Sequence, residues 1–443
     1  MKGRLFVGTF RHPYAYTVIF DSEDKDNALS VQYIWKTPGG HSWMHIHQTQ
    51  DPHIDMLYCT GWTDPPSLTA YQITGDSFSD DFRSGEHISP IKVNEAHPKY
   101  LSGYVTANEH ALYSVSGPQG DVFAIDPKDG YFITDGHREE GKAAPIQSFS
   151  FVSDEERAAL DRGENIGGIM DFGGLRHGGH SADLSPDGNR LYVADIGRNA
   201  IWTYNLENVT DAPRRVQLGS KTISKRPNDG PRHVWPCQAG GGKNRVVYVV
   251  QEHSSYVDIY EHTNNADGSM STDLAWRQCV NILPPDADCS LYWADEVRTS
   301  PAGDVLFAST RGLKPSEKGY LIAIRVDPTT GYLSGTPAQV SRETDYDEHL
   351  PLHRWQTPTS GGWANAISVC PTTGPKGEIY LCLTDSEQGW VWALQWTRES
   401  SFNIIGSVNL NEVTNESYPL EQRKGPKEDI GASVAVWYNT WDH

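Results

Sequence analysis

A short pattern of apolar residues centred on one aromatic position recurs seven times along the 443-residue chain. The gaps between successive aromatic positions are 52, 55, 79, 56, 59 and 73 residues. β-rich units that repeat every 40 to 60 residues, roughly, are typical of β-propellers. We therefore predict an all-β fold, a seven-bladed β-propeller of four-stranded blades. The aromatic positions are Phe6, Tyr58, Tyr113, Tyr192, Tyr248, Phe307 and Tyr380.

The segment from 180 to 218 shows the plan of one blade. Residues 180–185 are predicted as an inner strand, and Pro186-Asp187-Gly188-Asn189 is a strong turn signal. Further strands are predicted over 190–196, 200–204 and 215–218, and the alternating pattern falls on 200–204. The same order of strands and turns is found in the other repeats.

The two ends of the chain complement each other. Residues 3–20 supply two strands with no inner strand before them, and residues 431–438 supply such a strand. We predict that the N- and C-terminal strands pair and close the ring, which removes exposed sheet edges. Residues 1–443 are then a single propeller domain.

An insertion at about 127–177, between blades three and four, interrupts the repeat. It contains a predicted helix from Asp154 to Arg162 with Ser153 as its N-cap, followed by a glycine-rich segment over 163–179. A segment of this length is either a lid over a functional site or a decorative insertion. The sequence leaves both interpretations open.

The formal net charge of −20 argues against a nucleic-acid partner and against an anionic membrane surface, because both attract basic proteins. No apolar segment is long enough to span a membrane or to act as a secretion signal. The six cysteines show no C-x-x-C pairing, and we interpret them as reduced core residues. We therefore expect a cytoplasmic protein.

Candidate site residues follow from blade geometry. The start of each inner strand and the end of the strand paired with it lie at one face, so these positions surround a single opening. Charged side chains are rarely buried there unless they are paired or used. Asp195 and Asp385 are interpreted as turn caps. The remaining candidates are Trp43, Trp62, Tyr100, His180, Arg232, His233, Glu252, Asp295, Glu296, Arg311, Trp363 and Asn365.

Among these, His180, Arg232, Glu252 and Arg311 are the predicted catalytic set, because structural ion pairing does not require this combination at one opening. The other eight are predicted to bind a small-molecule substrate. No G-x-S-x-G motif, P-loop or dinucleotide fingerprint is present. His41, His45 and His47 lie close together in sequence, but no third ligand is evident near them, and we predict no metal site.

Several motifs carry a family resemblance: Thr357 to Gly362 followed by Asn365-Ala366, Pro231-Arg232, Ala308 to Arg311, and Thr384 to Trp390. With these the chain resembles the fungal 3-carboxy-cis,cis-muconate lactonising enzymes, seven-bladed cycloisomerases. The resemblance implies a catalytic set of His180, Arg232, Glu252 and Arg311. It also implies no metal or organic cofactor, and homo-oligomers among the related enzymes. The substrate would then be a carboxylated diene.

One departure keeps other functions open. The family pattern has His where this chain has Trp363, which suggests a larger, less charged substrate. Fungal secondary-metabolite cyclases, including hetero-Diels–Alderases, use similar scaffolds, so a pericyclase acting on a conjugated polyene is the first alternative. A non-catalytic binding platform is the second. Lactone hydrolysis with a bound divalent ion is the third.

Overall fold

The computed structural model describes residues 1–73, 90–134, 142–164, 178–335, 348–397, 401–413 and 430–441. They form two compact units. Unit 1 is Met1–His97, Ile125–Ala144 and Gly361–His443, and unit 2 is Pro98–Ala124 and Pro145–Ser360. The described strands make seven sheets, each an antiparallel meander of four strands, and two of the sheets gain a short fifth strand in parallel. This confirms the predicted seven-bladed β-propeller.

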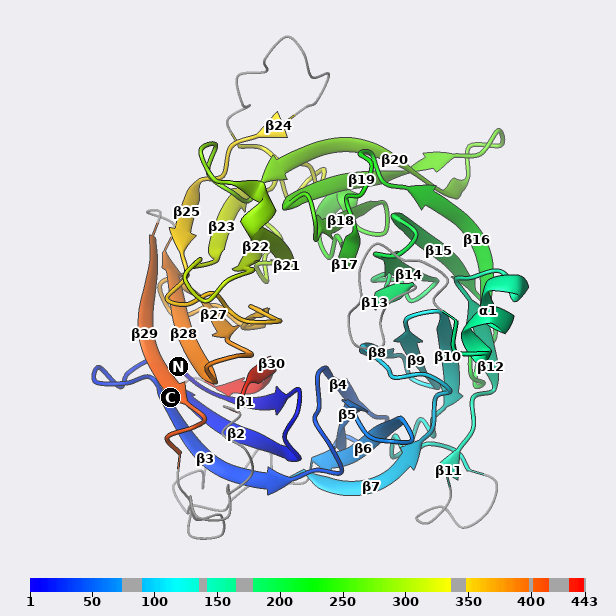
Figure 1. Cartoon of the computed structure of the whole chain (residues 1–443), viewed down its shortest axis with the longest axis horizontal. Helices are drawn as coiled ribbons and strands as arrows, with labels where there is room; N and C mark the ends of the chain where they lie inside the picture. The colour runs from blue at the N-terminus through cyan, green and yellow to red at the C-terminus, as the bar shows by residue number, and fades with distance from the viewer. Residues whose placement is uncertain are drawn as a thin grey trace. The chain divides into compact units, whose positions relative to one another are not determined.

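Unit 1 holds blades one, two and seven (Figure 1). Blade one is β3 (Leu29–Lys36), β2 (Tyr14–Asp21), β1 (Lys2–Thr9) and β30 (Ala432–Trp441). Blade two is β4 (Met44–Gln48), β5 (Asp55–Gly61), β6 (Ser67–Ile73), β7 (Ile91–Ala96) and β11 (Lys142–Ala143). Blade seven is β26 (Ile367–Val369), β27 (Ile379–Thr384), β28 (Trp390–Thr397) and β29 (Ser401–Asn409). β30 pairs antiparallel with β1, so the predicted pairing of the terminal strands is confirmed.

Unit 2 holds the other four blades. Blade three is β8 (Tyr104–Ala107), β9 (Ala111–Ser116), β10 (Gln119–Ala124) and β12 (Gln147–Ser150). Blade four is β13 (Gly179–Leu184), β14 (Arg190–Asp195), β15 (Ala200–Leu206) and β16 (Val216–Ile223). Blade five is β17 (Pro231–Pro236), β18 (Val246–Gln251), β19 (Tyr256–Asn264), β20 (Met270–Asn281) and β24 (Glu348–His349). Blade six is β21 (Tyr292–Thr299), β22 (Val305–Gly312), β23 (Tyr320–Arg325) and β25 (His353–Gln356).

The repeated aromatic position falls on the strand next to the innermost one in every blade, and each of these side chains is buried. The apolar side chains of neighbouring blades pack face to face. One cluster joins blades five and six, and another joins blades one and seven. Five cysteines are buried as predicted, whereas Cys289, which begins a short 3-10 turn (Cys289–Leu291), is exposed.

In blades four and six, a serine closes the hairpin between the two inner strands. In blade four the Ser185 hydroxyl accepts from the backbone N–H groups of Asn189 and Arg190, and Gly188 takes the positive φ of 65° that the turn requires. Ser300 and Gly303 repeat this arrangement in blade six. The turn fixes the register of the inner strand, and thereby the positions of the side chains at its other end.

The expected insertion is only partly separate from the blades. Within it, β11 joins blade two and β12 completes blade three. The predicted helix is present as α1 (Asp154–Asp161), with Ser153 and Glu156 forming a capping box. Residues 165–177, with most of the glycine-rich segment, lie outside the described residues. In the part of the chain that the structure describes, no helix has the length and hydropathy to cross a membrane.

Candidate functional site

Three consecutive blades of unit 2 carry a β-bulge near the start of their innermost strand. The extra residue is His180 in β13 and Arg232 in β17. In β21 the irregularity spans Asp295 and Glu296. A bulge leaves a residue outside the regular ladder and redirects its side chain, and bulges are common next to active sites. The candidate residues of blades four, five and six are therefore presented by the same backbone device.

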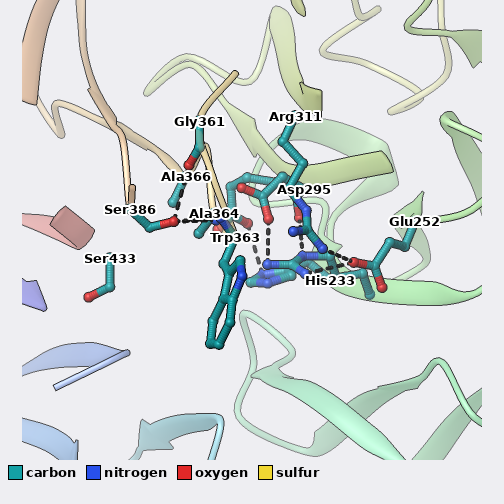
Figure 2. A network of polar contacts seen from close by, with 12 residues as sticks. His233, Glu252, Asp295, Arg311, Gly361, Trp363, Ala364, Ala366, Ser386 and Ser433 are labelled. Atoms are coloured by element: carbon teal, nitrogen blue, oxygen red, sulfur yellow. Dashed lines mark hydrogen bonds and ion pairs between the residues drawn. The ribbon is translucent and has the colours of Figure 1, made fainter. Parts of the chain in front are cut away.

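Two arginines share one carboxylate oxygen (Figure 2). Glu252 lies directly after β18, is fully buried, and accepts at Oε1 from Arg232 Nη1 at 3.0 Å and from Arg311 Nη2 at 2.9 Å. Arg232 also pairs through Nη2 with the Asp295 carboxylate, and its Nε donates to the Asp295 carbonyl at 3.1 Å. The Arg311 guanidinium lies over the Trp293 ring at 5.0 Å. Of the predicted set, Arg232, Glu252 and Arg311 are thus brought into direct contact.

A second buried network lies in the same unit. His233 Nδ1 is 2.9 Å from Glu296 Oε1, and the same oxygen forms an ion pair with Arg298 Nη1 at 2.7 Å. Arg298 Nη2 donates to the Tyr104 hydroxyl at 3.3 Å, and that hydroxyl lies 3.0 Å from both oxygens of Asp183. All five side chains are buried. The network connects β8, β13, β17 and β21.

His180 joins the two networks. Its ring centroid is 5.1 Å from that of His233, and it is hydrogen-bonded to the Arg232 backbone. Its Nδ1 is buried with no hydrogen-bond partner among the described residues. Burial, reinforced by the charge of Arg232, the His233 ring and the charge of Arg311, holds the pKa of His180 well below its usual range. The imidazole is therefore neutral at neutral pH, with Nδ1 available as an acceptor.

The buried acids of the second network are shifted in the opposite direction. Burial raises the pKa of Glu296 to about 7, although Arg298 opposes the shift. Burial likewise raises the pKa of Asp183 to about 7, again against Arg298. Desolvation lowers the pKa of Arg311, whereas the pKa of Arg232 is raised because Asp295 and Glu252 outweigh its desolvation. Two acids that titrate near neutrality thus lie in the network that adjoins the histidine pair.

Unit 1 contains a separate aromatic group. The Phe10 ring lies 5.2 Å from Trp62 and 6.0 Å from Trp363, and the Arg11 guanidinium stacks on Trp363 at 4.5 Å. Ser386 fixes this turn, because its hydroxyl accepts from the backbone N–H groups of Trp363 and Ala364 (Figure 2). Trp363 is 50% exposed. The group offers a flat aromatic surface with a cation beside it.

The contacts of the remaining predicted substrate residues are as follows. The Tyr100 hydroxyl donates to Asp161 of α1, so this tyrosine anchors the helix. Trp43 is half-buried and packs with the core that joins blades one and two. Asn365 is fully buried, and Gly361 packs closely against its side chain.

The residues interpreted as structural behave as such. Asp195 accepts from the backbone of Arg198 and from the Trp202 indole, and Asp385 accepts from the backbone of Glu387 and Gln388. Among the described residues, no group of three or more His, Cys, Asp or Glu side chains is placed to hold a metal ion. The His41 ring is occupied by the Thr60 carbonyl and the Tyr71 hydroxyl.

Sequence reasoning missed Asp183, Arg298 and Tyr104. A signal was present for the first two. Aligning the Ser-Pro turns of blades four and six places His180 opposite Asp295, and Asp183 opposite Arg298. Oppositely charged residues at equivalent buried positions of two repeats indicate a pairing across blades. Arg11 was also missed, since nothing in its local sequence distinguishes it from an exposed loop arginine.

Comparison with known proteins agrees with this architecture. The family described as "Lactonase, 7-bladed beta-propeller" matches residues 176–345. The chain is 40% identical over 433 residues to muconate cycloisomerase 1 of Cutaneotrichosporon cutaneum, covering 98% of this chain and 97% of that protein. It is 25% identical over 234 residues to the carboxy-cis,cis-muconate cyclase of Neurospora crassa, covering 50% of this chain and 53% of that one.

Solved structures show the same fold at low sequence identity. A putative 6-phosphogluconolactonase of Bacteroides fragilis superposes with a TM-score of 0.64 at 15% identity, covering 99% of this chain and 98% of that one. The periplasmic gluconolactonase of Pseudomonas aeruginosa gives 0.63 at 16% identity, covering 92% and 96%. The relatives are therefore lactonase- or cycloisomerase-type propellers.

Proposed function

The chain belongs to the fungal carboxymuconate cyclase family of seven-bladed β-propellers, and from this premise we propose that it is a cycloisomerase that closes a lactone ring on a muconate-type diene. We further propose that it needs no metal or organic cofactor. The observation that carries the proposal is the buried Glu252 carboxylate shared by Arg232 and Arg311, with a neutral His180 nearby. Such a site binds carboxylates and supplies acid–base chemistry at one place.

Arg232 and Arg311 would hold the substrate carboxylates. Guanidinium groups recognise carboxylates through parallel N–H donors, and their charge counts for more in a buried site. One substrate carboxylate oxygen then forms a C–O bond to a diene carbon. The π electrons move toward the conjugated carboxyl group, and the resulting enolate-like charge is stabilised by the arginines.

His180 is the proposed proton donor to carbon. It is neutral in the free enzyme, but an anionic substrate bound beside it raises the pKa of the imidazole by Coulomb attraction. Glu252 is assigned a different task, that of counter-ion to both arginines, because its Oε1 already accepts from each of them. The division leaves one group to move the proton and another to hold the cations in place.

The test is an ultraviolet assay of EDTA-treated protein with cis,cis-muconate and its 3-carboxy derivative. We expect the diene absorbance to fall with the wild type and to persist with Arg311→Met. Arg226→Met is the matched control, since Arg226 is another ion-paired arginine of unit 2 but pairs with Asp229 and Asp258. Absence of conversion by the wild type, or equal losses in both variants, would contradict the proposal.

A second candidate is a secondary-metabolite cyclase of the hetero-Diels–Alderase type. The observation that favours it is the aromatic group of unit 1, with Trp363 half-exposed and stacked on Arg11 where the family pattern has His. An aromatic surface preorganises an extended conjugated substrate, and orientation alone lowers a barrier by several kcal/mol, roughly. Conversion of uncharged polyenes, with no turnover of either muconate, would favour this function.

A further inference from the structure

The proposed ring closure has a proton requirement. A substrate carboxylate becomes an ester, so the substrate loses one negative charge, and one proton is taken up at carbon in every turnover. His180 is neutral in the free enzyme and is 9% exposed. The imidazole must therefore gain one proton in each cycle, and a neighbouring acid that titrates near neutrality is a source of that proton.

The group best placed to recharge it is the His233–Glu296 pair. The rings of His180 and His233 lie against each other with centroids 5.1 Å apart, and Glu296 Oε1 is 2.9 Å from His233 Nδ1. His233 is 3% exposed and Glu296 is 1% exposed. Because Arg232 and His233 are consecutive, one bulged strand start delivers both an arginine of the proposed anion site and this histidine.

We propose that Glu296 and His233 form a proton relay that recharges His180, an inference that rests on the proposed cycloisomerase function. The Glu296 O–H bond breaks as a proton moves to His233, and His233 passes a proton to His180. The substrate carbon receives the His180 proton, and water reprotonates the Glu296 carboxylate. One proton enters from solvent for each proton added to substrate, so the cycle balances. Glu296 acts through His233 and is a positioning residue in this scheme.

The surrounding charges are consistent with this direction of transfer. Glu296 faces Arg298 on its own strand, His233 and Arg232 on β17, and Asp183 and Tyr104 through Arg298. The carboxyl pKa of about 7 leaves a substantial fraction protonated at neutral pH. The pKa of His233 is held well below its usual range by burial and by Arg232 and Arg298, so His233 passes its proton on rather than retaining it. Turnover should then fall as pH rises through about 7.

The experiment compares Glu296→Gln with Asp195→Asn on the full chain. Both are buried acids of unit 2 with a raised pKa, about 7 for Glu296 and about 6 for Asp195, but only Glu296 lies against His233. We expect Glu296→Gln to lower kcat about tenfold or more with KM within about twofold, since general acid–base steps contribute at least this much. The decline in rate above pH 7 should also disappear. Asp195→Asn, at a cap that bonds Arg198 and Trp202, should keep both the wild-type kcat and the decline.

The pH profile separates a relay from a purely structural role. If Glu296→Gln retains the wild-type kcat, or retains the decline with pH, the relay is wrong. A folding defect is addressed by His233→Asn, which keeps a polar amide toward Glu296 but does not titrate, and which should also lose the decline. If the wild type turns over neither muconate, the proposed function fails and the relay fails with it. If it does turn them over while the Glu296 variant is normal, only the relay fails.

A measurement independent of turnover completes the test. Infrared difference spectra of wild type minus Glu296→Gln should contain the C=O band of a protonated carboxyl that is lost as pH rises through about 7. A difference spectrum without that band between pH 6 and 8, roughly, would overturn the assignment of Glu296 as the proton store.

Discussion

Replacing Glu252 by Gln tests the central charge arrangement, because it removes one negative charge at nearly constant volume. Glu252 Oε1 accepts hydrogen bonds from Arg232 at 3.0 Å and from Arg311 at 2.9 Å, and the side chain is fully buried. Removing one partner of a buried ion pair typically costs about 3–5 kcal/mol. In the variant, Arg232 keeps its ion pair with Asp295, and the glutamine amide oxygen still accepts a hydrogen bond. We therefore expect the free energy of unfolding to fall by about 3 kcal/mol, the lower end of this range.

The same substitution should tighten anion binding. A substrate carboxylate held by the two arginines lies near the Glu252 carboxylate, and like charges about 5.5 Å apart at an effective dielectric constant of about 20 repel by about 3 kcal/mol. Relief of that repulsion corresponds to roughly a hundredfold gain in affinity. Glu252→Gln is thus expected to be less stable than the wild type and a better binder of dicarboxylates.

Two assays decide the matter. Urea unfolding at pH 7 gives the stability difference, and calorimetric titration with a saturated six-carbon dicarboxylate, which cannot cyclise, gives the affinity. Arg311→Met in the Glu252→Gln background should restore part of the lost stability, since the uncompensated cation is then gone. If the Glu252 variant were as stable as the wild type and bound the dicarboxylate more weakly, Glu252 would not be the counter-ion of these arginines.

Three further predictions follow from particular contacts. His180→Ala should lower kcat by about 10² to 10⁴-fold with an unchanged circular dichroism spectrum, and a near-normal rate would remove His180 from the mechanism. Trp363→His should shift kcat/KM from apolar polyenes toward carboxylated muconates with little loss of stability, as Trp363 is half-exposed; an unchanged ratio in a substrate panel would contradict its role in specificity. Burial raises the pKa of Asp195 to about 6, so its contribution to folding is present at low pH and is lost as pH rises from about 4 to 6. Relative to Asp195→Asn, the wild type should lose about 3 kcal/mol of unfolding free energy over that window in urea titrations, whereas a pH-independent difference would refute the shift.

The architecture was predictable because repeated, local sequence patterns specify it. Tyr192 and Phe307 mark equivalent strands of different blades, and the pairing of β30 with β1 follows from a missing strand at one end and a surplus strand at the other. The turn at Ser185 and the N-cap at Ser153 depend only on neighbouring residues. Signals of this kind need no knowledge of distant contacts.

The site was predictable in part, because strand ends could be assigned but bulges could not. His180, Arg232 and Glu252 were identified from their places in the blades. Tyr100 was also identified in this way, and its place among the substrate residues stays a prediction, with its hydroxyl on Asp161 of α1. A bulge shifts the side chains of a strand by one position, and local residue preferences do not predict where it occurs. The pairing of Glu296 with His233 depends on two such shifts on different strands.

Charge balance links the two buried networks of unit 2. Arg232 and Arg311 are matched by Glu252 and Asp295, and each of these side chains is buried, so an arriving substrate anion meets a site that is already neutral. A buried site does not accept a further unpaired charge without cost, and protonation of a neighbouring group is the cheapest compensation. His180 is hydrogen-bonded to the Arg232 backbone, and burial raises the pKa of Glu296 to about 7. Proton uptake is then a consequence of binding an anion among paired charges, and the same proton is the one that ring closure consumes.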